Sequence, residues 1–241
     1  MISKNELKYI QSLCQKKQRA AEGVFIAEGP KLAEELLASD YKIVKGYATA
    51  AWLAENKTGK GFMEVSEIEL EKMTGLQTAN QVILVCEQKI QKSIPDLSKK
   101  LSLVLDGIQD PGNLGTIIRI ADWFGISQII ASEDTVELYN PKVIQSTMGS
   151  FIRVPVYFTD IVAFLTATKL PVYGAMLEGL SMYELEKPVT GLLVIGNESK
   201  GIREPIQPLI KQAITIPRFG GAESLNAAVA TGILVSHLKA K

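Results

Sequence analysis

Histidine and cysteine are scarce in this chain of 241 residues. The single histidine, His237, lies close to the end of the chain, and the two cysteines, Cys14 and Cys86, are far apart in the sequence. These counts argue against a metal site built from histidine and cysteine ligands, and a Ser-His-Asp triad would have to use His237. They also argue against a disulfide scaffold. We therefore expect no metal and a reducing, cytoplasmic environment.

Long apolar runs and an excess of charge of one sign are also missing. No run approaches the roughly 20 apolar residues that a membrane span needs, and the N-terminal segment is charged rather than apolar like a signal peptide. The 26 Lys and Arg residues balance 26 Asp and Glu residues, and 46% of the chain is hydrophobic. This composition is typical of a globular protein without a membrane segment, built as one large or two ordinary domains.

The zero net charge hides a basic segment at the start of the chain. The first 19 residues include Lys16, Lys17 and Arg19, and Glu6 is the only acidic residue among them. A solvated amphipathic helix is the interpretation that this segment favours by itself. Clustered positive charge also suits phosphate contacts, so Lys16, Lys17 and Arg19 are candidate nucleic-acid-binding residues.

A polar stretch over residues 87–100, which contains Pro95, separates two halves of the chain. The first half alternates strand-like and helical segments, beginning with a helix expected over residues 3–19. Ser66 and Glu69 have the spacing of a capping box, which predicts a short helix after them. We therefore expect a small α/β domain over residues 1–95 and a second domain over residues 100–241.

The second half contains six short apolar runs rich in β-branched residues. They cover residues 101–107, 127–132, 153–158, 170–176, 191–198 and 213–218. Helical stretches lie between most of them, and a long helix is expected over residues 223–239. Continuous apolar strands that alternate with helices predict a parallel sheet with helices on both faces. Ligands bind at the carboxyl ends of such strands.

The first of these strands runs into a loop with glycines and then into a helix. Asn113 and Gly115 open that helix, and Arg119 follows in its second turn. Glycines before a helix N-terminus let a ligand approach backbone N–H groups. The G-x-G-x-x-G spacing is absent, which argues against a nicotinamide-dependent enzyme. A tight turn with Arg119 in a surface salt bridge explains this loop equally well.

Two later strand ends have a similar character. Gly196 and Glu198 follow a buried apolar run, without the Gly-Lys-Ser/Thr sequence of a Walker loop. Polar groups at such a position need partners, and a ligand's hydroxyls or amines would suit them. Further along, two glycines lead through residues 220–226 into the final helix. An ordinary turn, and an N-cap at Glu223 or Ser224, explain these two loops taken singly.

Taken together, the three loops resemble the three motifs of the SpoU/TrmH family, the ribose 2′-O-methyltransferases of the SPOUT superfamily. The matching residues are Asn113-x-Gly115-x-x-x-Arg119, Gly196-Asn197-Glu198-x-x-Gly201, and Ile216-Pro217 through Ser224-Leu225-Asn226-x-x-x-Ala230. The match covers the whole second half. The first half is similar to the substrate-binding domain of the family through the run QKKQRAAEGVFIAEGPKLAEELL, a less specific motif.

The resemblance implies properties that spacing alone does not show. Family members close the C-terminal parallel sheet with a trefoil knot, bind S-adenosylmethionine in the knotted loops and act as homodimers with the site near the interface. The implied fold is therefore α/β, with a knotted C-terminal domain preceded by a smaller α/β domain that binds the RNA substrate. The implied catalytic residues are Arg119, Asn113, Glu198, Ser224 and Asn226, and the implied cofactor-binding residues are Gly196, Gly201, Ile216 and Leu225.

The reaction that the resemblance implies is attack of a ribose 2′-hydroxyl on a methyl group bound to sulfur. Arg keeps its proton at neutral pH, so we expect Arg119 to clamp the target phosphate and stabilise the developing oxyanion as a cation. Glu198 would orient Arg119 or receive the proton. Ser224 and Asn226 would position the ribose and the cofactor by hydrogen bonds.

Two alternatives stay open for the RNA and for the activity. Ribosomal RNA is the expected substrate, because the first domain resembles those of family members that methylate ribosomal RNA, and transfer RNA is the alternative. A non-catalytic RNA-binding module of the same fold is a second hypothesis, since a basic segment and a 2′-hydroxyl would still allow RNA binding. The joint presence of Arg119, Glu198 and Asn226 argues against it.

Overall fold

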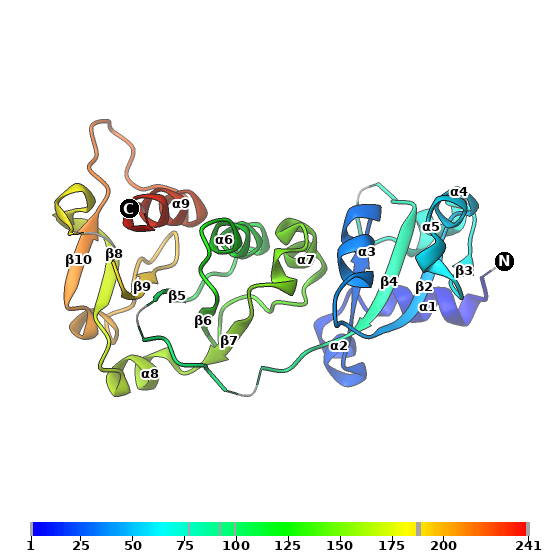
Figure 1. The fold of residues 1–241 in the computed structure, drawn as a ribbon, viewed down its shortest axis with the longest axis horizontal. Coiled ribbons are helices and arrows are strands. Elements are labelled where there is room, and N and C mark those ends of the chain that lie inside the picture. Colours follow the sequence, from blue (N-terminus) through cyan, green and yellow to red (C-terminus); the bar gives the residue numbers. More distant parts are fainter. Residues whose placement is uncertain (1, 77, 92, 99, 187–188, 240–241) are drawn as a thin grey trace. The chain divides into compact units, whose positions relative to one another are not determined.

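The computed structural model describes residues 2–76, 78–91, 93–98, 100–186 and 189–239, and it divides into two compact units. The first comprises Met1–Ile90 and Leu138–Ile152, and the second comprises Gln91–Glu137 and Arg153–Lys241. Each unit has its own sheet (Figure 1). The expected domains over residues 1–95 and 100–241 stay a prediction.

The first unit is built on a sheet with the strand order β1-β4-β2-β3. Its strands are β1 (Val24–Glu28), β2 (Ile43–Ala48), β3 (Met63–Glu64) and β4 (Val82–Glu87). The central strand β4 runs antiparallel to both β1 and β2, and β3 adds a short parallel edge. The strand-like segments expected in the first half are present as β1, β2 and β4, while β3 is too short to give a recognisable apolar pattern.

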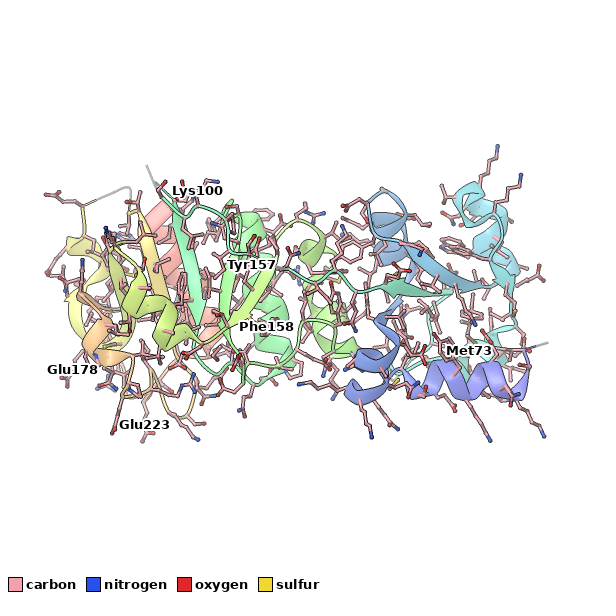
Figure 2. All side chains as sticks on the ribbon, turned by 90° about the horizontal axis from the view of Figure 1, so that it is seen from below. Met73, Lys100, Tyr157, Phe158, Glu178 and Glu223 are labelled. Atoms are coloured by element: carbon pink, nitrogen blue, oxygen red, sulfur yellow. The ribbon has the colours of Figure 1, made fainter. Side chains whose placement is uncertain are left out.

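Short helices cover this sheet. They are α1 (Lys4–Ser12), α2 (Lys16–Glu22), α3 (Pro30–Leu37), α4 (Ala50–Glu55), α5 (Glu67–Met73) and α7 (Pro141–Thr147), with the 3₁₀ turns η1 (Lys57–Gly59) and η2 (Ser150–Ile152). The capping box of Ser66 and Glu69 is present at the start of α5, as predicted. Met73 lies over α1 in Figure 2 and shares an apolar cluster with Ile10 and Leu13.

The single helix expected over residues 3–19 is wrong. The chain leaves the helical conformation after Leu13, and Gln15 is extended before α2 begins. The side chain of Arg19 explains why the break is stable, because its Nη1 donates a hydrogen bond of 2.8 Å to the carbonyl of Leu13. Arg19 is only 1% exposed, so this guanidinium is part of the interior of the first unit.

An aromatic cluster joins β1 to the segment Leu138–Ile152 within the first unit. The ring of Phe25 stacks on Tyr139 at a centroid distance of 4.6 Å and meets Phe151 edge-on at 5.8 Å. Tyr41 packs against Phe25 and Phe151. The hydroxyl of Tyr139 accepts from the backbone N–H of Lys89 and donates to its carbonyl. The segment therefore completes the core at this face of β1.

The second unit is a parallel sheet of six strands in the order β10-β8-β9-β5-β6-β7. The strands are β5 (Leu101–Leu105), β6 (Ile129–Ser132), β7 (Val156–Thr159), β8 (Val172–Ser181), β9 (Gly191–Ile195) and β10 (Gln212–Thr215). Every strand pair in it is parallel. The six apolar runs thus predicted the strands correctly, and β5, β6 and β9 are buried along their whole length.

Helices lie on both faces of this sheet (Figure 1). They are α6 (Pro111–Trp123) and α9 (Ala227–Lys239) on one face and α8 (Ile161–Ala167) on the other, with the 3₁₀ turns η3 (Met182–Glu184) and η4 (Gln207–Leu209) in connections. The final helix begins at residue 227 rather than 223. Asn226 is its N-cap in place of Glu223 or Ser224, since Asn226 Oδ1 accepts from the N–H groups of Ala228 and Val229. No described helix combines the length and the apolar character that a membrane crossing requires.

The buried guanidinium of Arg19 leads to a prediction about stability. Arg19→Met keeps the apolar stem but leaves the carbonyl of Leu13 without its charged donor, so it should lower the free energy of unfolding by about 1.5–3 kcal/mol. Urea denaturation followed by fluorescence of the buried Trp52, with Trp123 replaced by Phe, measures this change. Lys17→Met, at an exposed position two residues away, is the matched control. Equal stability of the two variants would contradict the assigned role of Arg19.

Candidate active site

The loops that the sequence singled out leave the sheet at one edge. Leu105 and Ile195, the last residues of β5 and β9, are direct neighbours in the parallel register. On the other side of β9, Val194, Gly174 and Ala213 share a row across β9, β8 and β10. The loops that follow β5, β9 and β10 therefore begin at the same edge, as expected for a parallel sheet.

A chain of hydrogen bonds connects these three loops through their side chains. Asn113, in the first turn of α6, donates from Nδ2 to Glu198 Oε1 in the loop after β9. Asn226, at the start of α9, donates from Nδ2 to Asn113 Oδ1 at 2.8 Å. Three of the five predicted catalytic residues are thus brought together, although they lie up to 113 positions apart in the sequence.

The amides of this chain are oriented by their backbone surroundings. Asn226 Oδ1 caps α9, so its Nδ2 is the atom that faces Asn113. The backbone N–H of Asn113 donates to Asp110 Oδ1 at 2.8 Å, which fixes the first turn of α6. The orientation of each amide, with its donor and its acceptor, is therefore fixed. The series of hydrogen bonds ends at the carboxylate of Glu198.

The loop after β9 is a tight turn. The backbone groups of Asn197 and Gly201 exchange hydrogen bonds of 3.1 and 2.8 Å, and Asn197 Nδ2 donates to the carbonyl of Gly107 at 2.8 Å. A Cβ on Gly196 would lie 2.3 Å from the carbonyl carbon of Gly201, and Gly201 has a φ of 64°. Glycine is therefore required at both predicted cofactor-binding positions by the turn itself.

An ion-pair network lies beneath these loops, and sequence reasoning missed it. Asp106, at the end of β5, is fully buried. Its carboxylate accepts from the backbone N–H of Arg203 at 2.8 Å and from Nε of the same residue. Arg203 Nη1 also reaches Asp134 after β6, at 3.3 Å. A charged residue directly after an apolar strand was the available signal, but nothing in the sequence indicates its partner 97 positions away.

The other predicted site residues are exposed or half-buried. Arg119 and Ser224 are exposed, and neither side chain has a hydrogen bond or ion pair with any described residue. Arg119 therefore does not form the surface salt bridge that the sequence left open. Leu225 is 45% exposed, and Ile216 is half-buried at the start of the loop after β10.

The expected basic cluster is corrected at one position. Lys16 and Lys17 are exposed in the first turn of α2, as a phosphate-binding surface requires. Arg19, predicted with them as an RNA-binding residue, is buried because its guanidinium serves the carbonyl of Leu13. It has no face to offer to RNA in this conformation.

The fold and the joined strand-end loops define the class of the protein as an α/β protein with a ligand site at the carboxyl edge of a parallel sheet. Residues 100–236 match the SpoU rRNA Methylase family, and residues 4–84 match the MRM3-like substrate binding domain. The chain therefore belongs to the SpoU rRNA Methylase family. The resemblance drawn from its three motifs is confirmed.

Relatives in this family are similar over nearly the whole chain. The 23S rRNA (guanosine(2553)-2'-O)-methyltransferase RlmP of Bacillus subtilis is 32% identical over 93% of this chain and 92% of its own length. A putative RNA methyltransferase of the TrmH family from Porphyromonas gingivalis has a TM-score of 0.87 at 36% identity, covering 99% of this chain and 98% of that one. An AdoMet-bound rRNA methyltransferase from Sinorhizobium meliloti has a TM-score of 0.86 at 29% identity, covering 99% and 96%.

The buried network predicts a stability difference between two aspartates. In Asp106→Asn the new amide group places a donor against the N–H groups of Arg203, so the free energy of unfolding should fall by about 2 kcal/mol. Asp134→Asn, at the exposed end of the same network, should change it by less than about 0.5 kcal/mol. Urea denaturation monitored by circular dichroism compares the two. A larger loss at Asp134 would contradict the role assigned to Asp106.

Proposed function

We propose that this protein transfers the methyl group of S-adenosylmethionine to a ribose 2′-hydroxyl of ribosomal RNA. The observation that carries the proposal is the hydrogen-bonded chain of Glu198, Asn113 and Asn226, which joins the three motif loops of a SpoU methylase domain. Relatives over the full length of the chain support the reaction and the cofactor, because their names specify 2'-O-methylation of 23S rRNA and a bound AdoMet.

The residues expected to hold the cofactor fit such a ligand by their chemistry. Leu225 presents an apolar side chain that is 45% exposed, on the loop that leads into Asn226. The close approach of Gly196 to Gly201 keeps the backbone of the neighbouring turn compact. An apolar surface beside backbone hydrogen-bonding groups suits an adenosine with a polar amino-acid end. When bound, the cofactor supplies an electrophilic methyl group.

The side chains of the site then have separate tasks. Arg119, exposed on α6 and without a described partner, is available to clamp the phosphate of the target nucleotide as a cation. The same charge stabilises the oxyanion that develops at the 2′-oxygen. Glu198 is the acceptor for the proton, and Asn113 holds its carboxylate in place. Asn226 orients Asn113, and we assign the contact with the ribose to the exposed hydroxyl of Ser224.

Ribosomal RNA is favoured over transfer RNA by the extent of the relationships. The rRNA methyltransferase RlmP is similar to 93% of this chain, and the MRM3-like substrate binding domain matches residues 4–84 of the first unit. A solved structure that concerns 2-OH methylation of C/U34 on tRNA is similar to only 58% of this chain, at a TM-score of 0.53. A non-catalytic RNA-binding module is disfavoured, because Arg119, Glu198 and Asn226 occur together in this chain.

Further properties of the family belong to the same proposal. We infer that residues 1–95 form the substrate-binding domain, with Lys16 and Lys17 on the RNA backbone, and that residues 100–241 form a methyltransferase domain closed by a trefoil knot. We also propose a homodimer, a cytoplasmic location and catalysis without a metal. Trp123 is 85% exposed on α6 and Val229 is 51% exposed on the neighbouring α9, which supports an interface over these helices.

Methyl transfer tests the function directly. Purified protein is incubated with radiolabelled S-adenosylmethionine and one of two RNAs, ribosomal RNA or transfer RNA. Both RNAs are prepared without 2′-O-methyl groups. We expect label in ribosomal RNA. The labelled nucleotides should be those whose 3′-phosphodiester bond resists alkaline cleavage, because their 2′-hydroxyl is methylated. Label in transfer RNA alone would change the substrate, and the absence of label from both would overturn the proposal.

Substitution of Arg119 separates its charge from its geometry. Arg119→Lys keeps the charge but loses the two-pronged hydrogen-bonding group, so single-turnover methylation should slow by roughly two to three orders of magnitude. Arg119→Ala should be at least as slow, and the affinity for S-adenosylmethionine should stay nearly constant in both. Arg153→Lys, which alters an ion pair with Asp122, is the matched control. A near-wild-type rate in Arg119→Ala would remove this residue from the mechanism.

The proposed dimer predicts a mass in solution of about twice that of the 26.3 kDa chain at micromolar concentration. Trp123→Glu should shift the distribution toward monomer, because a charge would replace an apolar contact at the interface. Multi-angle light scattering measures both. Leu177→Glu, at a leucine that is 73% exposed on β8, is the control substitution outside these helices. A wild-type monomer would contradict the assembly.

A further inference from the structure

The loop between β10 and α9 carries a phenyl ring that extends into solvent. Phe219 is 97% exposed, more than any other large apolar side chain in the described part of the chain. Its ring has no ring contact with any residue that the structure describes. A single exposed apolar side chain is ordinary by itself, so the position of Phe219 in the molecule decides what the ring can do.

A side-chain hydrogen bond gives this loop a defined tip. Arg218 Nη1 donates to the carbonyl of Ala222 at 3.2 Å. This contact closes the chain around Phe219 and the two glycines that follow it. In Figure 1 the loop rises away from the sheet between β10 and α9. The ring therefore belongs to a short closed turn whose two ends are held by a strand and a helix of the second unit.

The two glycines of the tip are not required by the fold. A Cβ on Gly220 or Gly221 would meet nothing within 4 Å, and neither residue has a φ in the left-handed region. They differ in this respect from Gly196 and Gly201, which the turn after β9 requires. Without side chains at these two positions, the backbone beside Phe219 is open to the close approach of a flat ligand.

The tip lies within reach of the proposed active site. Ala222, which Arg218 binds, precedes Asn226 by four residues, and four extended residues span at most about 14 Å. Ser224 lies between them, so the ring of Phe219 shares a loop with two of the proposed catalytic residues. An unpaired RNA strand with one ribose at this site can therefore bring a neighbouring nucleotide to the ring.

The surroundings of the ring favour a nucleobase over an apolar protein surface. The core of a protein–protein interface is apolar and depleted of charge, whereas Phe219 stands between a cation and two glycines. Arg218 is exposed, and it has no ion pair with a described residue. A guanidinium has five N–H donors, so those not used on Ala222 suit a phosphate. Proteins bind single-stranded RNA by this combination of an aromatic ring and a cation.

We propose that Phe219 positions the substrate RNA by stacking on the base next to the nucleotide that is methylated. The inference rests on the proposed function for its RNA substrate. Stacking is tolerant of sequence, because every base has a π face, so Phe219 holds the strand without selecting the base. The ring takes no part in proton or methyl transfer. Its loss should therefore weaken the binding of RNA and leave the chemical step unchanged.

Single-turnover methylation over a range of ribosomal RNA concentrations tests this role. Phe219→Leu keeps an apolar side chain without a π face, so the RNA concentration that gives half the maximal rate should rise roughly five- to a hundredfold. Phe219→Tyr keeps the ring and should stay within about twofold of the wild type. The maximal rate at saturating RNA and the affinity for S-adenosylmethionine should be unchanged in both variants.

Tyr183→Leu is the matched control. Tyr183 is 64% exposed, and its ring meets His237 in the last turn of α9, at the opposite end from the loop. This variant should keep the RNA dependence of the wild type. An unchanged RNA dependence in folded Phe219→Leu would overturn the role. A lower affinity for S-adenosylmethionine, or a shift to monomer in light scattering, would also overturn it, because the ring would then serve the cofactor or a second copy of the chain.

Photocrosslinking tests the contact without the reaction. The probe is a short oligomer of 5-iodouridine, whose base becomes attached to a neighbouring aromatic ring on irradiation. Mass spectrometry of the full-length protein should locate the attachment at Phe219, and attachment only at other residues would contradict the contact. Methyl transfer that does not depend on Phe219 leaves the function standing and removes the stacking role. Attachment at Phe219 without methyl transfer does the reverse.

Discussion

The arrangement of the strand-end loops depends on the contact between Asp106 and Arg203. The carboxylate of Asp106 is buried at the end of the central strand β5. It binds Arg203 through both backbone and side chain, and so ties the loop after β9 to the end of β5. A charge removed from water needs such partners, because an unpaired one costs several kcal/mol. Glu198 and Asn113 meet above this tie, and Asn226 joins them from α9. The amide geometry at the surface therefore rests on an ion pair in the interior.

The parts of the fold with a local cause could be predicted from the sequence. Each strand of the second unit is a continuous apolar run, and the Ser66–Glu69 capping box needs only its own spacing. The three loops were recognisable because their residue types and order match a family, although each alone had an ordinary explanation. Their convergence also followed from the parallel sheet, whose carboxyl ends share one edge.

The features that the sequence could not predict depend on partners distant along the chain or on competition between local signals. Apolar spacing continues through Leu13, and the break in the expected helix appears only when Arg19 folds back onto its carbonyl. Asn226 caps α9 although Ser224 is an equally good capping residue by type, because Asn226 also pairs with Asn113. The clustering of charge wrongly predicted that Arg19 lies on the surface. The sequence does not show which of the neighbouring cations binds the buried carbonyl of Leu13.

The aromatic cluster around Phe25 has a consequence for the synthesis of the protein. Phe25 and Tyr41 leave the ribosome long before Tyr139 and Phe151, the rings that cover them in the finished unit. A nascent chain of the first 90 residues therefore exposes an apolar face that its own sequence cannot close. The core at this face of β1 is completed only by a stretch translated after β5 and β6, and until then its exposed rings favour aggregation.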